Sequence, residues 1–401
     1  MKKKYSPAFQ LTVKYALLQS LFWIIFAIIG SFANVYLLDR GFYNTEIGII
    51  LSAGAVLSIV FQSMIAALVD KYQKVQLKYV ILVLLFLLLL SIANLGFHQN
   101  NRLITGGSYI LIFTILDSMV SFLNSFAMEY INLGIDLNYG LARGMGSISF
   151  AFIAYIIGFV IAKLSSSIIL PASMLAVVIM LGITLSFRLP YTYIEARQNE
   201  TAVHGAGKEG QSFFTFFIQY RRFFLLLIGF SLLYIGHSFI NTYHINIIQN
   251  VGGNSSNMGL SISIAAIVEL PAMASFAFLS SKVKCSTLIK IGAAFFTIKA
   301  LLTFAAPSIG FIYFSMVFQM GSFALFTPAS IYYVNKIMDQ SNRVKGQAIL
   351  GAATLGIGGT LGNFIGGKIL DAFPVSVMLA VGLILSIIGF VITLIFTDRN
   401  V

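Results

Sequence analysis

The residues of this sequence that could do chemistry are a few charged side chains inside long apolar stretches. A charged group within a hydrocarbon layer costs about 2.5–3.5 kcal/mol even on lenient scales, so each one needs a partner or a function. The candidates are Asp117, Glu129, Arg143, Glu269 and Lys299, with His237 and His244 as softer cases.

Glu129 and Arg143 lie on either side of a short polar loop, at the facing ends of two apolar stretches. An arginine offers five donors in a planar fork, whereas a carboxylate offers only acceptors. Together they can grip the vicinal hydroxyls of a sugar, because each hydroxyl both donates and accepts. The alternative is a structural ion pair that fixes the hairpin, and the sequence leaves both interpretations open.

Glu269 lies within an apolar stretch just before Pro271, and Lys299 lies thirty residues later in the next stretch. The two can simply pair with each other. Alternatively, Glu269 carries a proton, because an apolar cavity disfavours the charged form of a carboxylate. Asp117 has no cation nearby in its own stretch, so we rank it slightly ahead of Glu269 as the proton carrier.

His237 and His244 are seven residues apart, which places them on one face of a single predicted helix. Metal-binding histidine pairs on a helix are usually four residues apart, so we expect no metal there. Polar residues that line a pore, or a proton relay, are the remaining interpretations. The sequence also has no HExxH motif and no nucleotide-binding loop, which argues against an enzyme and against an ATP-driven pump.

The composition indicates that membrane-spanning helices position these side chains. Of 401 residues, 58% are hydrophobic and 9% are charged, whereas soluble domains are about 25% charged. A membrane-spanning helix needs about 20 apolar residues. Twelve apolar runs of that kind predict spans at 11–37, 44–69, 77–98, 103–131, 141–164, 168–187, 222–250, 257–280, 285–305, 309–338, 344–367 and 374–397.

The net charge of +12 gathers in alternate loops, which indicates membrane orientation and not nucleic-acid binding. Positive loops stay on the cytoplasmic side, so we expect a multi-pass protein of the cell (inner) membrane with both termini in the cytoplasm. Three lysines after Met1 lead into the first apolar run without a cleavage site, which predicts a first span and no removable signal peptide. The positive loops contain Lys71, Lys74, Lys78, Arg188, Arg197, Lys208, Lys282, Lys284, Lys336, Arg343 and Lys345.

The chain divides into two similar halves, residues 1–187 and 222–401, joined by a polar linker at 188–221. Arg143-Gly144 opens the fifth span and Lys345-Gly346 opens the eleventh, as expected for paired six-helix repeats. The segment 213–222 is predicted to lie along the membrane surface. Eight glycines in the eleventh span favour either close helix packing or a flexing, gate-forming helix.

The segments Tyr36-Leu37-Leu38-Asp39, Thr45-Glu46-Ile47-Gly48-Ile49-Ile50, Phe61-Gln62 and Asp70-Lys71 resemble the major facilitator superfamily, closest to the branch of the lactose and raffinose permeases. The loop signature of that superfamily is Gly-x-x-x-Asp-(Arg/Lys)-x-Gly-(Arg/Lys). Asp70, Lys71 and Lys74 occupy its charged positions, while Ala66 and Gln73 replace its glycines.

Further on, Tyr139-Gly140-Leu141-Ala142-Arg143-Gly144-Met145-Gly146 resembles the permease helix that supplies a sugar-binding arginine, and Phe150 stands where that helix has a sugar-stacking tryptophan. Glu269 and Lys299 match a buried carboxylate and cation. The chain departs from the permeases in the tenth span, where Gln319 and Ser322 replace a histidine and the proton-carrying glutamate.

The resemblance implies an all-α membrane protein with twelve transmembrane helices in two six-helix bundles around a central cavity. It implies a secondary transporter that works by alternating access, with proton-coupled symport of a sugar or oligosaccharide, no cofactor and a monomeric state. The alternatives are a nucleoside transporter, a drug or metabolite effluxer and, outside transport, an intramembrane enzyme or lipid-handling protein. The expected substrate-binding residues are Glu129, Arg143, Phe150, His237 and Gln319; the expected ion-coupling residues are Asp117, Glu269 and Lys299; and the expected conformational motif is Asp70, Lys71 and Lys74.

Overall fold

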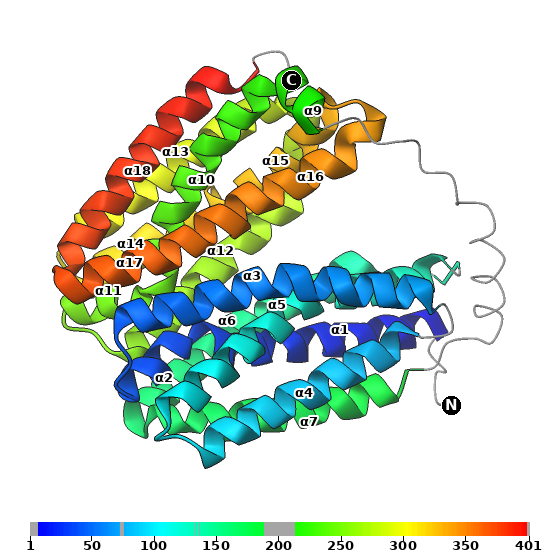
Figure 1. The fold of residues 1–401 in the computed structure, drawn as a ribbon, viewed down its shortest axis with the longest axis vertical. Coiled ribbons are helices and arrows are strands. Elements are labelled where there is room, and N and C mark those ends of the chain that lie inside the picture. Colours follow the sequence, from blue (N-terminus) through cyan, green and yellow to red (C-terminus); the bar gives the residue numbers. More distant parts are fainter. Residues whose placement is uncertain (1–6, 73–75, 133, 136, 188–212, 399–401) are drawn as a thin grey trace, which may run out of the picture. The chain divides into compact units, whose positions relative to one another are not determined.

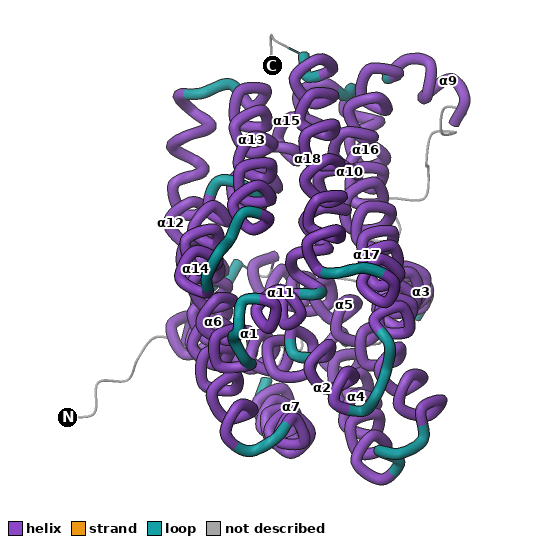
Figure 2. Tube along the Cα trace, turned by 90° about the vertical axis from the view of Figure 1, so that its left-hand side faces the viewer, coloured by secondary structure: helices purple, strands orange, loops and turns teal. Residues whose placement is uncertain are grey.

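A computed structural model describes residues 7–72, 76–132, 134–135, 137–187 and 213–398, and in these ranges every regular element is a helix (Figure 2). The N-terminal part of the chain contains α1 (Pro7–Ile25), α2 (Ala33–Asp39), α3 (Asn44–Lys71), α4 (Leu77–Phe97), α5 (Arg102–Asn132), α6 (Tyr139–Lys163) and α7 (Ile169–Leu185). The C-terminal part contains α9 (Phe213–Gln219), α10 (Arg221–Thr242), α11 (His244–Asn250), α12 (Ser255–Lys282), α13 (Cys285–Phe304), α14 (Ile309–Val317), α15 (Phe323–Ile337), α16 (Arg343–Gly351), α17 (Thr360–Ala372) and α18 (Val375–Phe396).

Twelve helical stretches of the described chain are long and apolar enough to cross a membrane, which confirms the predicted number of spans. The fourth, for example, was predicted at 103–131 and runs from Arg102 to Asn132. Large apolar side chains cover their outer surfaces, such as Phe152 at 67% exposure and Phe278 at 65%. Such surfaces are stable in lipid, where their exposure costs nothing, and unstable in water.

The predicted seventh span is not one continuous helix. It breaks at Tyr243, so His237 lies on α10 and His244 on the short α11, and the prediction that one helix face carries both is wrong. Tyr243 is fully buried, and its hydroxyl reaches the carbonyl oxygens of Asn44 and Asn363. The helix breaks where these tertiary contacts are made, and the sequence has no proline or glycine at this position that would predict the break.

Two further spans are irregular within their length. The tenth span is interrupted by a 3₁₀ turn at Phe318–Met320 between α14 and α15. The eleventh contains a π-helical segment at Ala352–Gly359 between α16 and α17. In α17, a Cβ added to Gly362 would lie 2.5 Å from Cβ of Ser238 on α10. This approach supports the close-packing interpretation of the glycine-rich span.

The described chain forms two compact units. The first comprises residues 1–30, 54–150 and 169–213, and in it α4 packs against α5 and α7 (Figure 1). The second comprises 31–53, 151–168 and 214–401, and in it α18 packs against α10 and α13. Residues 188–212 of the linker predicted at 188–221 lie outside the described residues, and the division into halves at that point stays a prediction.

The segment predicted to lie on the membrane surface begins with the short helix α9. Phe216 on this helix is fully buried, and the ammonium group of Lys345 lies 4.5 Å from the centre of its ring. Phe217 and Ile218, on the other side, are 44% and 56% exposed. One face of α9 therefore packs against the second unit, and its opposite, apolar face is exposed.

Candidate functional site

Arg143 lies in the first turns of α6, against the aromatic side chain of Trp23 on α1. Its guanidinium carbon is 4.4 Å from the centre of the indole, which is stacking distance for a cation on an aromatic face. Its Nη1 donates to Oγ of Ser147, one turn further along α6, at 3.2 Å. The guanidinium group therefore has two contacts here, an aromatic ring and a hydroxyl.

Phe150 continues the same face of α6 and meets the indole of Trp23 edge-on, with ring centres 6.1 Å apart. The predicted residues Arg143 and Phe150 thus share one neighbour in the first unit. Both side chains are only partly buried.

The two carboxylates predicted in this unit lie on α5. Glu129 is 6% exposed and sits three residues before the end of the helix. Asp117 lies near its middle and, within the part of the chain that the structure describes, makes no hydrogen bond or ion pair. A carboxylate is costly in an apolar span, and a structural ion pair does not explain why Asp117 is there.

In the second unit, Glu269, Gln319 and Lys299 form a chain in which the glutamine is the middle member. Nζ of Lys299 donates to Oε1 of Gln319 at 2.6 Å, and Nε2 of Gln319 donates to Oε1 of Glu269 at 2.8 Å. Lys299 is 1% exposed and Gln319 5%. An amide suits this place, because its carbonyl faces the cation and its N–H the carboxylate.

Gln319 occupies the 3₁₀ interruption between α14 and α15, and the hydroxyl of Ser322 lies 3.4 Å from its carbonyl oxygen. Interrupted spans are where membrane carriers commonly place their binding groups, since the freed backbone can line a cavity. The side chain of Phe295 on α13 fills the space beside Gly321, where a Cβ would collide with it. The sequence analysis singled out Gln319 but did not predict the interruption of the span at that residue.

His237 on α10 lies among aromatic rings. Its ring stacks on Phe323 at 5.6 Å with a 6° angle between planes and meets the edge of Phe296 at 5.2 Å. Nε2 is hydrogen-bonded to the side chain of Asn241 at 2.8 Å, while the buried Nδ1 has no hydrogen-bond partner among the described residues. Phe296 lies one turn before Lys299 on α13, and Phe323 begins α15 just after the interruption that contains Gln319, so the rings lie close in the chain to members of the polar group.

His244 has a separate environment, in which Nε2 is paired with the hydroxyl of Ser261 on α12 at 2.8 Å. Of the predicted loop motif, Lys71 ends α3 with its ammonium 5.6 Å from the centre of the Tyr72 ring. Lys74 and the side chain of Asp70 lie outside the described residues.

A group of side chains that the sequence analysis did not single out joins α3 to α17 at one end of the second unit. The carboxylate of Asp371 accepts from the backbone N–H of Asn44 at 2.9 Å, the backbone N–H of Thr45 at 2.7 Å and the side chain of Asn44 at 3.1 Å. These are the first two N–H groups of α3, which have no partner within the helix. Asp371 therefore caps α3 from another element.

Asparagines extend this contact. Asn246 on α11 donates to Oδ1 of Asn44 at 3.1 Å, and Asn34 on α2, only 3% exposed, donates to the backbone carbonyl of Thr242 at 2.7 Å. We call Asn34, Asn44, Tyr243, Asn246 and Asp371 the end cluster. Asparagines inside otherwise apolar spans were the signal in the sequence that could have revealed it.

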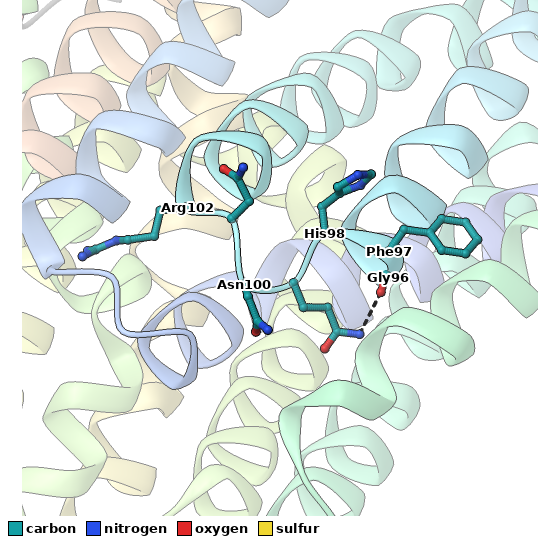
Figure 3. Close-up of a pocket in the computed structure, with 7 residues that line it drawn as sticks. Gly96, Phe97, His98, Asn100 and Arg102 are labelled. Carbon is teal, nitrogen blue, oxygen red and sulfur yellow. Dashed lines mark hydrogen bonds between the residues drawn. The ribbon is translucent and has the colours of Figure 1, made fainter.

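A hollow lies elsewhere, lined by residues Gly96 to Arg102, from the end of α4 to the first residue of α5 (Figure 3). Nε2 of Gln99 donates to the carbonyl of Gly96 at 3.0 Å, and the side chains of Phe97 and Arg102 point away from each other. None of the predicted site residues belongs to this loop.

Twelve apolar spans, interrupted helices and buried polar groups on their faces define a multi-pass membrane protein. The chain matches the MFS_1 like family over residues 15–391, and it belongs to that family of the major facilitator superfamily. The general resemblance is thereby confirmed, while the lactose and raffinose branch stays a prediction.

Among relatives, the maltose permease of Geobacillus stearothermophilus is 24% identical over 399 residues, which cover 99% of this chain and 97% of that protein. Among solved structures, a substituted form of the nucleoside transporter NupG is similar with a TM-score of 0.82 at 15% identity, covering 97% of this chain and all of that one. A D-xylose–proton symporter has a TM-score of 0.69 at 15% identity, covering 98% of this chain and 99% of that one. At such identities the structural likeness shows the fold alone.

Proposed function

We propose that this chain is a proton-coupled symporter that takes up a sugar or short oligosaccharide by alternating access. The observation that carries the proposal is the guanidinium of Arg143, whose central carbon lies 4.4 Å from the centre of the Trp23 indole. A planar fork of donors beside aromatic rings suits a polyhydroxylated ring, whose hydroxyls need donors and whose C–H faces need apolar contact. The relative that matches along almost the whole chain is called a maltose permease, which supports this substrate class.

In this proposal Glu129, Arg143, Phe150, His237 and Gln319 bind the substrate. Asp117 carries the proton, because it lacks the partner that Gln319 provides to Glu269. In this proposal Lys299 and Glu269 both stay charged, because the side-chain amide of Gln319 links them, and they form part of the wall of the site. The proton gradient supplies the energy, and the carrier works as a monomer without a cofactor.

The carrier is proposed to lie in the inner membrane with both termini in the cytoplasm, as the positive loops indicate. In that orientation α3 begins at the outer face, and the end cluster is the seal that closes the substrate path on that side. Opening requires Asp371 to release the N-terminus of α3, so the seal is a set of hydrogen bonds that can re-form in each cycle.

The test is a thermal-shift screen of purified protein against maltose and lactose, nucleosides and cationic drugs. A ligand that binds only the folded state stabilises it by about 2.7 kcal/mol at one hundred times its Kd. We expect sugars to raise the melting temperature and an Arg143→Gln variant to lose the effect. Stabilisation by nucleosides alone would replace the sugar by a nucleoside, and stabilisation by cationic drugs alone would favour an effluxer.

A further inference from the structure

Trp23 is the only tryptophan of the chain, and it stands where α1 meets the Arg143 face of α6. Besides Arg143 and Phe150, it contacts Phe22 and Phe26 of its own N-terminal segment, with ring centres 5.3 Å and 5.4 Å away. It is thus the centre of an aromatic group with a single cation, and it has no role in the function argued above beyond supporting that cation.

Packing alone does not explain a tryptophan at this place. Its Nε1 is buried and has no hydrogen-bond partner among the described residues. A buried donor without an acceptor destabilises the fold, so a phenylalanine would fill the same apolar space at lower cost. What the indole adds over a smaller ring is the strongest cation–π face among side chains.

The backbone of α6 also makes room for the indole. A Cβ added to Gly146 would lie 2.5 Å from Cδ1 of Trp23, whereas a Cβ added to Gly144 would meet no atom within 4 Å. Gly146 lies between Arg143 and Phe150 on the helix, so the position of the ring depends on that glycine.

Stacking occupies the face of a guanidinium and leaves its N–H groups pointing outward in its plane. The indole, 4.4 Å from the guanidinium carbon, and the hydroxyl of Ser147, 3.2 Å from Nη1, together restrict the directions in which Arg143 can donate. We propose that Trp23 is the positioning residue of the substrate site, which sets the plane of the Arg143 fork for a ligand with adjacent hydroxyls. This rests on the proposed function in one respect, that the ligand binds at Arg143.

The single tryptophan makes the proposal directly measurable, because all indole emission of the native chain comes from this position. Titration of the purified protein with maltose is expected to change the emission saturably, at the concentrations that raise the melting temperature. The Arg143→Gln variant is expected to lose that saturable change while its emission without ligand shifts, because the cation has left the ring.

Transport by variants separates positioning from packing. Gly146→Ala displaces the indole without removing it, and we expect it to raise KM about tenfold or more with kcat nearly retained. Gly144→Ala is the matched control with the same helix propensity gain and should leave KM unchanged. Trp23→Phe keeps an aromatic face and should raise KM only a few-fold, whereas Trp23→Leu should raise it at least as much as Gly146→Ala does.

The outcomes distinguish this proposal from the proposed function. If maltose stabilises and is transported, yet indole emission does not respond and the two glycine variants behave alike, the role of Trp23 is overturned and sugar transport stands. If nucleosides and not sugars change the emission, the role of Trp23 stands and the sugar assignment is overturned. Because the titration and the glycine pair use a chain that keeps Trp23, a failure of Trp23→Leu to fold does not affect either result.

Discussion

At Arg143 we expect the planar shape of the guanidinium to contribute more to substrate binding than its charge does. A lysine can also lie over Trp23, but it lacks the planar fork and its three donors rotate. We expect Arg143→Lys to raise KM for the transported sugar about tenfold or more, which corresponds to about 1.4 kcal/mol of lost binding. Uptake kinetics in vesicles measure this change in KM, with Arg102→Lys at the exposed start of α5 as the control. Unchanged KM would show that Arg143 serves only as a charge.

The two candidate proton carriers differ in their surroundings, and this separates their variants. Asp117 has no partner within the described chain, whereas Glu269 accepts from Gln319 at 2.8 Å. Coupling requires a group whose charge changes during the cycle. We therefore expect Asp117→Asn to abolish gradient-driven accumulation while exchange of labelled substrate across the membrane continues. Glu269→Gln should reduce both, because it disturbs the chain to Lys299. Accumulation by both variants would exclude both carboxylates as the carrier.

Gln319 is expected to matter for stability as well as for transport. Replacing it with methionine keeps the volume but leaves the ammonium of Lys299, which is 1% exposed, without its acceptor at 2.6 Å. A buried polar group that loses its partner costs about 1–3 kcal/mol, and more when it is charged. Thermal unfolding in detergent should show a lower Tm for Gln319→Met, and no comparable change for Gln99→Met in the α4–α5 loop. Equal Tm values for the two variants would mean that Lys299 finds another acceptor.

At the scale of helices, α17 and α3 are joined by a cap that one element provides for the other. Asp371 satisfies the first two N–H groups of α3, and its charge complements the positive end of the helix dipole. A lost cap of this kind costs about 0.5–2 kcal/mol. We expect Asp371→Ala to shift the carrier toward the form that is open at the end cluster, by about two- to thirtyfold.

This shift can be followed by cysteine labelling, because the native chain has one cysteine, Cys285, and it is buried. In a Cys285→Ser background, a cysteine placed at Ser52, which is 8% exposed and bonded to the carbonyl of Thr360, reports opening of the cluster. Asp371→Ala should speed its reaction with an impermeant maleimide. Lys368→Ala, an exposed charge on the same helix, is the control; equal rates for both variants would remove Asp371 from the seal.

For the whole molecule, the proposal predicts uptake that follows the proton gradient. Vesicles with an imposed inward gradient should accumulate sugar above the external concentration, and a protonophore should abolish this accumulation without stopping equilibration. Accumulation should also fail in Asp117→Asn vesicles under the same gradient. Transport that only equilibrates the substrate and ignores pH would mean facilitated diffusion in place of symport.

The fold was readable from the sequence because each span carries its own signal. In lipid, a run of about twenty apolar residues must form a helix, because only the helix satisfies its backbone hydrogen bonds, and this holds for each span independently of the other spans. The twelve spans and the polar residues inside them therefore followed from composition and order alone. The family-bearing segments around Asp70 and Arg143 indicated the superfamily for the same reason, since they are contiguous in the chain.

What the sequence could not reveal depends on residues that meet only in the folded molecule. Direct pairing of Glu269 and Lys299 was one of two interpretations of the sequence, yet a glutamine twenty residues beyond Lys299 links them, in a span that is interrupted there. Trp23 meets Arg143 from a helix more than one hundred residues earlier, and Asp371 caps a helix more than three hundred residues away. Such partners are chosen by the packing of helices and by the need of buried polar groups for one another, and neither leaves a periodic pattern within a single span.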